Sequence, residues 1–130
     1  MKLRLDASGV LRELRRRSKA AVQAGALALE MQIRREIQAG IRGDRSGPRR
    51  VDTGRYLESW SPGSSDSAVQ LQVSGAVASV SVTNRLDYAD KVEFGDVTMR
   101  PGLHVHTAVA AVEKDADAIL SRAMLPALQK

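Results

Sequence analysis

Two histidines and a run of carboxylates are the residues best suited to chemistry in this sequence. His104 and His106 form a His-x-His pair, which on a strand would place both imidazoles on one face, as in some metal sites. No third ligand accompanies them, and two histidines where a loop meets a helix are more often surface or interface residues. We therefore expect no metal site here, and no cofactor.

The carboxylates recur every three residues, at Asp87, Asp90, Glu93 and Asp96. Such a cluster could serve acid–base or metal chemistry. Arg85 and Lys91 lie among them, however, which favours a solvated or salt-bridged face. The sequence also contains no phosphate-binding loop, nucleophile elbow or dinucleotide fingerprint. We expect a protein that is not an enzyme and has no catalytic residues.

A third group consists of arginines in the Gly-rich stretch 40–54, namely Arg42, Arg45, Arg49 and Arg50. Arginines on a loop attract a phosphate backbone without reading base sequence. The alternative is a solvated loop, or one that orders against an acidic patch on a partner. We slightly favour the alternative, because a channel that passes DNA must let it slide and dense positive charge would hold it.

The overall composition limits what these residues can do. The 130-residue chain has the length of one domain and contains no cysteine, which excludes disulfides and thiolate sites. Its net charge of +5 is divided unequally: residues 1–55 carry 14 Lys/Arg and 6 Asp/Glu (+8), and residues 56–130 carry 6 and 9 (−3). The basic half could bind nucleic acid or stack on the acidic face of a neighbour.

The nucleic-acid alternative is a small basic DNA- or RNA-binding protein, suggested by the pI of about 10.1. Few aromatic residues are present for base stacking, and the basic residues of the first helix form no continuous stripe. The sequence shows no apolar segment typical of a signal peptide or a membrane span, so we expect a soluble protein made in the cytoplasm, with no membrane partner.

The longest predicted element is an amphipathic helix over residues 7–39. Its apolar stripe recurs at spacings of three and four, and Gly40 is predicted to form a left-handed C-terminal cap. A second apolar face lies away from this stripe, bracketed by Arg17 and Arg35. It is either a small-residue surface shielded by arginine stems or a subunit contact. Its members are Ala20, Ala24, Leu27, Ala28 and Met31.

A β-hairpin is predicted around residues 68–83, where apolar and polar residues alternate. A two-residue turn at Ser74-Gly75 pairs Val73 with Ala76, Leu71 with Ala78 and Val69 with Val80, so that one apolar face results. A two-stranded hairpin is only marginally stable alone, so its apolar face must be covered by a helix, by further strands or by a neighbouring subunit.

The remaining elements complete an α+β fold in one domain, residues 1–130. Asp52 or Thr53 is predicted to cap a short helix that runs through Trp60, and flexible loops are expected near 40–52 and 61–68. A second amphipathic helix spans about residues 105–123, and Pro126 is predicted to break or kink it. The two long helices should pack on a small, mainly antiparallel sheet to which residues 1–5 could add a strand.

Two short motifs in this order carry a family resemblance. The run Asp52-Thr53-Gly54-Arg55 precedes the hairpin, and Tyr88-Ala89 with Val92-Glu93-Phe94-Gly95 follows it, ahead of an alanine-rich C-terminal helix. This order resembles the tail-completion proteins of siphophages and lambdoid phages, also described as neck or head–tail joining proteins. The resemblance covers roughly residues 10–125. Tyr56 and the His104–Ala108 segment depart from the family's usual residues.

The resemblance implies a structural virion protein that forms a ring, a hexamer as in such families, between the capsid connector and the tail tube. Its partners would be copies of itself and the adjoining connector, completion, tube or terminator proteins, with non-specific contact to genomic DNA in the lumen. Head closure, completion and tail termination stay open as its position. Within the second motif we expect Phe94 to be a buried peg and Glu93 to pair with an arginine, for which Arg55 is the candidate.

Overall fold

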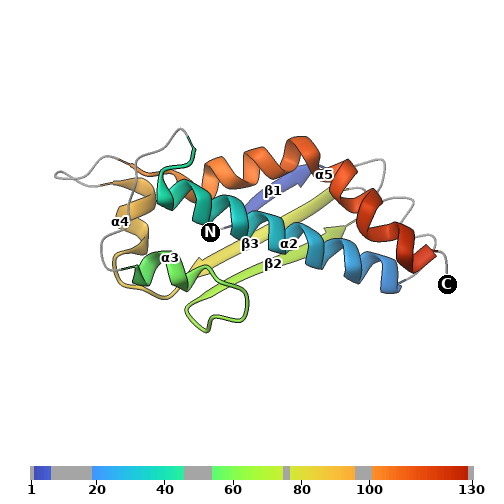
Figure 1. The fold of residues 1–130 in the computed structure, drawn as a ribbon, viewed down its shortest axis with the longest axis horizontal. Helices are drawn as coiled ribbons and strands as arrows, with labels where there is room; N and C mark the ends of the chain where they lie inside the picture. Colours follow the sequence, from blue (N-terminus) through green and yellow to red (C-terminus); the bar gives the residue numbers. More distant parts are fainter. Residues whose placement is uncertain (1, 7–18, 46–53, 75–76, 96–100, 129–130) are drawn as a thin grey trace.

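The computed structural model describes residues 2–6, 19–45, 54–74, 77–95 and 101–128, with side-chain environments for 23–45, 54–72, 79–95 and 101–123. The fold is α+β, as predicted (Figure 1). The elements, in chain order, are β1 (Lys2–Asp6), α2 (Lys19–Arg42), α3 (Arg55–Ser59), β2 (Ser67–Ser74), β3 (Val77–Asn84), α4 (Ala89–Phe94) and α5 (His104–Leu128).

The three strands form one antiparallel sheet in the order β1-β3-β2. β1 pairs along β3 from Lys2 opposite Ser81 to Asp6 opposite Val77, which confirms the expectation of a further strand at the start of the chain. The central strand β3 is therefore hydrogen-bonded on both edges. The two long helices α2 and α5 lie side by side over one face of this sheet (Figure 1).

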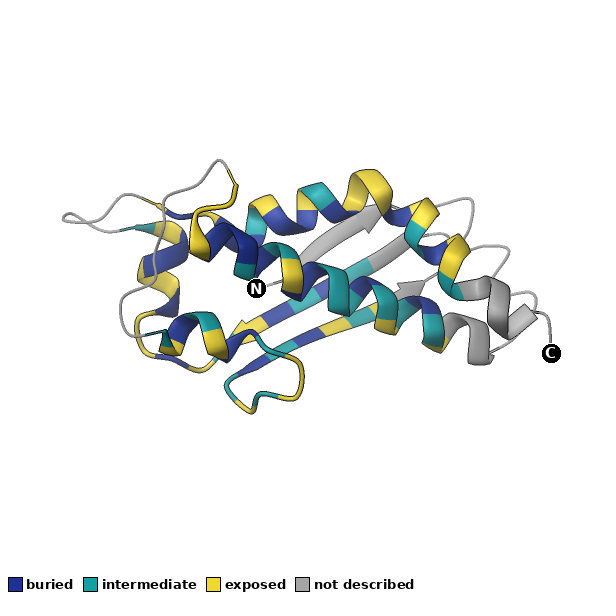
Figure 2. Cartoon of the chain, in the orientation of Figure 1, coloured by how far each residue is buried: buried dark blue, intermediate teal, exposed yellow. Residues whose placement is uncertain are grey.

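The core lies between the helices and the sheet (Figure 2). The described part of the apolar stripe on α2 is buried as predicted, and the stripe on α5 faces it. Close-packed aliphatic side chains in this layer hold the fold together, because their burial removes apolar surface from water. The buried aliphatic residues of the helices are Leu29, Ile33, Ile37, Ile41, Val105, Val109, Val112, Ala116 and Leu120. Neither long helix, within its described residues, is apolar enough over a sufficient length to cross a bilayer.

The end of α2 differs from the prediction. The helix continues through Gly40 to Arg42, and the left-handed residue is Gly43, with φ 88°. The Gly43 N–H donates to Gly40 O (3.0 Å) and the Asp44 N–H to Ala39 O (2.9 Å), which is the Schellman pattern. Gly40 is instead buried against α5, where an added Cβ would lie 3.3 Å from the His104 ring. Its small size serves helix–helix packing.

The hairpin register also differs, by two residues. Val73 pairs with Ala78, Leu71 with Val80 and Val69 with Val82, whereas Ala76 lies outside the described residues. A shift of two leaves each side chain on its predicted face, so alternation alone cannot distinguish the two registers. The observed register brings Val69 opposite Val82, both buried, and extends the ladder to Ser67 opposite Asn84.

Two further segments are settled by the structure. The stretch after Asn84, for which a helical turn and an irregular crossing were both open, contains the short helix α4. Pro126 was predicted to break or kink the last helix, and it does not break it, because α5 continues to Leu128. Residues 61–66 form turns between α3 and β2, and β2 already begins at Ser67, inside the stretch predicted as loop.

Candidate functional site

The two motif segments that are distant in sequence meet at one end of the molecule. α3 follows the first motif and α4 contains most of the second, and the Tyr56 and Tyr88 rings pack with their centroids 6.0 Å apart. Tyr56 also contacts Trp60 edge-on at 6.2 Å. The aromatic cluster thus connects the two short helices, which lie at one end of the sheet (Figure 1).

The start of α3 is formed without a side-chain cap among the described residues. Its N-cap is Gly54, which has φ 82° and accepts the Glu58 N–H through its carbonyl at 2.9 Å. A left-handed backbone at this point explains the glycine of the first motif. The predicted caps Asp52 and Thr53 lie outside the described residues. Arg55, the first residue of α3, is exposed.

Glu93 holds the start of α5. Its side chain is buried, and its two carboxylate oxygens accept the Val105 N–H (2.9 Å) and the His106 N–H (3.0 Å). The His106 ring nitrogen Nδ1 lies 2.5 Å from Oε2. These hydrogen bonds engage both carboxylate oxygens of Glu93, and the expected pairing with Arg55 stays a prediction. A carboxylate at a helix N-terminus accepts hydrogen bonds from amides that have no partner within the helix, and its negative charge interacts favourably with the helix dipole.

Phe94 is not the buried peg of the second motif, because its side chain is exposed and stands edge-on to His106 at 5.6 Å. Val92 and Glu93 point inward instead. α4 has only six residues, so which of its faces is covered depends on where α3 and α5 lie. Gly95, which ends the motif, has φ 77° and serves as the C-cap of α4.

His104 is buried, contrary to the expectation of a surface or interface residue. Its ring lies between Gly40 of α2 and Gly102. His106, two residues later, is partly exposed and engaged with Glu93. The His-x-His pair is thus divided between two environments, and no group of three potential metal ligands occurs in the described part of the chain. Asp87 and Asp90 are exposed, and Asp96 lies outside the described residues.

We expect Gly102→Ala to lower the free energy of unfolding by about 1–3 kcal/mol, since overpacking forces neighbours to shift. The new Cβ would lie 2.5 Å from His104 Cε1 and 2.7 Å from the Val92 carbonyl oxygen. Urea unfolding measures the change. Thr107→Ala, at an exposed position of α5, is the control and should stay within about 0.5 kcal/mol. Equal stability of the two variants would contradict the packing described here.

A buried polar network connects α2 to α3 and to the sheet. Arg34 Nη1 donates to Trp60 O (3.1 Å), Ser61 O (3.4 Å) and Ser67 Oγ (2.8 Å). The Ser67 hydroxyl donates in turn to Ser59 O. Asn84 Nδ2, at the end of β3, donates to Ser59 Oγ at 2.8 Å. Sequence reasoning missed this network, because Arg34 had no distinguishing signal beside Arg35.

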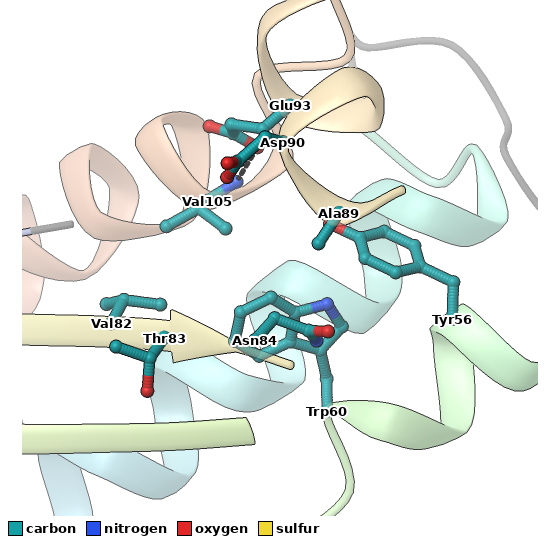
Figure 3. A pocket seen from close by; sticks show the side chains of 9 residues that line it. All are labelled: Tyr56, Trp60, Val82, Thr83, Asn84, Ala89, Asp90, Glu93 and Val105. Atoms are coloured by element: carbon teal, nitrogen blue, oxygen red, sulfur yellow. Dashed lines mark hydrogen bonds between the residues drawn. The ribbon is translucent and has the colours of Figure 1, made fainter. Parts of the chain in front are cut away.

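A pocket opens between α3, the end of β3, α4 and the start of α5 (Figure 3). Its cavity volume is about 150 Å³. The indole N–H of Trp60, a residue only 1% exposed, has no hydrogen-bond partner among the described residues. The space suits water or one small polar group that can accept a hydrogen bond. The lining residues are Tyr56, Trp60, Val82, Thr83, Asn84, Ala89, Asp90, Glu93 and Val105.

Burial raises the pKa of the Tyr56 hydroxyl to about 12. In the unfolded chain this hydroxyl has a pKa of about 10, so between these two values only the unfolded chain loses the proton. This contribution to stability is complete below about pH 10 and is lost as the pH rises through 12. Tyr56→Phe should abolish this loss of stability at high pH, because phenylalanine has no proton to lose. The free energy of unfolding of Y56F relative to wild type should therefore rise by about 2 kcal/mol between roughly pH 9 and 11.5 in urea titrations. Parallel pH profiles would contradict this.

Two of the four arginines in the stretch 40–54 are paired with acids of their own chain. Arg45 binds Glu36 through Nε (2.8 Å) and Nη2 (3.0 Å), and this hydrogen-bonded guanidinium lowers the pKa of Glu36. Arg42 is the last residue of α2, and its Nε lies 3.2 Å from Asp44 Oδ2. Arg49 and Arg50 lie outside the described residues.

The second apolar face of α2 is open to solvent over its described part. Leu27 is exposed, and Ala24, Ala28 and Met31 are partly exposed. The side chain of Ala20 is outside the described set. The predicted subunit contact therefore has an accessible apolar surface, and whether it is one stays a prediction.

Comparison with protein-family models, with curated proteins and with solved structures finds no match to this chain.

Proposed function

We propose that this chain is a structural protein of a tailed-bacteriophage particle, a subunit of a ring at the head–tail junction that joins the capsid connector to the tail tube. The observation that supports it best is the meeting of the two motif segments. Residues 54–60 and 88–95 contain most of the residues on which the resemblance depends, and they pack together through Tyr56 and Tyr88. Because the two segments pack together, they form one structural unit rather than two unrelated matches.

The buried polar contacts of this unit hold its helices in position, as expected for a structural protein. Arg34 holds α3 to α2 and β2, and Glu93 holds the start of α5. Every one of these buried polar groups is used for positioning, so the unit is a rigid end piece on the two-layer core. A ring subunit needs such rigidity, because small errors in the angle between neighbours accumulate around a closed ring.

The pairing of Arg42 and Arg45, in the Gly-rich stretch 40–54, is compatible with a ring through which DNA slides. Arg45 is held in a bidentate pair with Glu36, and Arg42 is close to Asp44, so part of the positive charge of this stretch is neutralised within the chain. The reduced charge favours weak, non-specific contact with duplex DNA over tight binding. It also weakens the alternative of a nucleic-acid-binding protein, which needs free cations along one surface.

The test is the mass of the purified protein by light scattering, alone and after mixing with phage tails or with portal-bearing heads. A ring-sized species, or stable incorporation into either particle, is the expected result. The opposite result is a monomer that ignores both particles and binds duplex DNA with an affinity that falls steeply with salt. That outcome would replace the proposal with the nucleic-acid-binding alternative.

A further inference from the structure

The pocket between α3, the end of β3, α4 and the start of α5 is larger than one buried water requires (Figure 3). Its volume is about 150 Å³. A cavity needs only about 10–15 Å³ to hold one water molecule. The pocket therefore has room for several waters or for one group of the size of a short side chain.

Trp60 contributes a buried hydrogen-bond donor to the wall of this pocket. The residue is only 1% exposed, and its indole N–H has no hydrogen-bond partner among the described residues. The indole nitrogen lies on the edge of the ring that faces Tyr56 and Ala89 (Figure 3). A buried donor that has lost water and gained no acceptor is unfavourable. The pocket thus offers a position for a group that accepts a hydrogen bond.

The Tyr56 hydroxyl lies close to this donor. Burial raises its pKa to about 12, the Trp60 indole opposes the rise, and the charges of Glu93 and Asp90 add to it. The hydroxyl is therefore near the indole N–H and within the electrostatic field of both carboxylates. Because a hydroxyl can donate as well as accept, Tyr56 can join Trp60 in binding one acceptor atom.

The ionisable residues that line the pocket are acidic. They are Asp90 and Glu93, and no Lys, Arg or His is among the described lining residues. Both oxygens of Glu93 already accept amides at the start of α5, whereas Asp90 is exposed and can accept further hydrogen bonds. Arg85 and Lys91 are close in sequence, but both are exposed and neither lines the pocket. Two carboxylates in the wall disfavour an anionic occupant.

These groups distinguish between three classes of occupant. A carboxylate could accept from Trp60 but would be repelled by Asp90. An ammonium or guanidinium group could pair with Asp90 but has no acceptor for the indole N–H. A primary carboxamide is neutral and carries both functions, because its oxygen accepts hydrogen bonds and its NH₂ group donates them.

We infer that this pocket binds a primary carboxamide, the group carried by asparagine and glutamine side chains and by small free amides. The carboxamide oxygen accepts from the Trp60 indole N–H and the Tyr56 hydroxyl, and the NH₂ group donates to Asp90. The carbon chain that carries the carboxamide contacts Val82 and Val105, the aliphatic side chains of the wall. This inference goes beyond the proposed function and does not depend on ring formation.

The single tryptophan of the chain provides a direct test, because the full-length protein gives one indole ¹H–¹⁵N signal in NMR spectra. Titration with acetamide should shift this signal saturably, with a dissociation constant on the order of 1–10 mM for so small a ligand. Acetate has the same shape and should bind at least about tenfold more weakly. Methylammonium should leave the signal in place. No saturable shift with acetamide, or an equal affinity for acetate, would overturn the inference.

Asp90→Asn tests the exclusion of anions, with Asp87→Asn as the matched control. Both residues are exposed, and only Asp90 lines the pocket. D90N should lower the preference for acetamide over acetate by about threefold or more, because one repulsive charge is removed. D87N should keep the wild-type preference. An unchanged preference in D90N, or the same fall in both variants, would contradict the assigned role of Asp90.

A blocked amino acid distinguishes the two sources of the carboxamide. N-acetylglutamine N-methylamide carries the group on a protein side chain, and the corresponding glutamate derivative controls for its backbone amides. Tighter binding of the glutamine derivative than of acetamide would identify a partner protein's side chain as the occupant. Binding of acetamide alone would identify a free amide. Equal shifts with the glutamine and glutamate derivatives would overturn carboxamide recognition.

The outcomes for the pocket and for the proposed function are separable. A protein that enters phage particles but whose indole signal ignores acetamide keeps the structural function and loses this site. A protein that binds acetamide selectively but never joins heads or tails keeps the site and loses the structural function.

Discussion

Arg34→Met is expected to lower the free energy of unfolding by about 3 kcal/mol, and Arg35→Met to change it by less than about 0.5 kcal/mol. The two arginines are adjacent in sequence but differ in environment. Arg34 is buried and donates to the carbonyl oxygens of Trp60 and Ser61 and to Ser67 Oγ. Methionine has a similar length and is apolar, so it fills the space and leaves these acceptors without a donor.

The comparison of the two variants separates the network from the loss of a positive charge. Both substitutions remove one arginine from α2, and both replace it with a good helix former. Urea unfolding at neutral pH measures the two free energies, and the m-value shows whether unfolding stays two-state. If R34M and R35M are equally stable, the contacts of Arg34 do not hold α3 in place.

Glu93→Gln is expected to lower the free energy of unfolding by about 2 kcal/mol. The two carboxylate oxygens accept the Val105 and His106 amides at the start of α5. Glutamine keeps the shape but offers one oxygen, and its NH₂ group is placed against the second amide. The negative charge that favours the helix N-terminus is lost as well.

Asp90→Asn on the same short helix is the matched control. Asp90 is exposed and forms no ion pair within the described residues, so its neutralisation should change stability by less than about 0.5 kcal/mol. Amide hydrogen exchange gives a local readout, because E93Q should speed exchange at Val105 and His106 before the rest of α5. Equal protection of these amides in E93Q and D90N would exclude the capping role.

Several features of the fold could be predicted from the sequence because they are local. The spacing of Leu29, Ile33 and Ile37 specifies a helix with one buried stripe. Alternation through residues 68–83 specifies strands and which face of them is apolar. Together these patterns predict the α+β class and two long helices that cover a small antiparallel sheet, and the structure confirms them.

The site was predicted only in part. The motif segments around Gly54 and Glu93 were identified, but the partners of their side chains were not. Glu93 was expected to pair with an arginine and is found on the amides that begin α5, whereas Phe94 was expected to be buried and is exposed. The sequence indicates that a buried carboxylate needs hydrogen-bond partners. It does not distinguish between an arginine and the free amides of a helix end, because both can supply them.

Tertiary structure alone decided the features that depend on distant neighbours. Gly40 could end a helix, and only the approach of His104 shows that its small size is needed within one. Two hairpin registers kept the same face, and the pairing of Val69 with Val82 selects one of them. Arg34 and Arg35 are the same residue type in the same helix, and the carbonyls of Trp60 and Ser61, just after α3, make Arg34 a buried anchor. Local periodicity determined which residues face inward; the identity of each partner depended on segments far away in the chain.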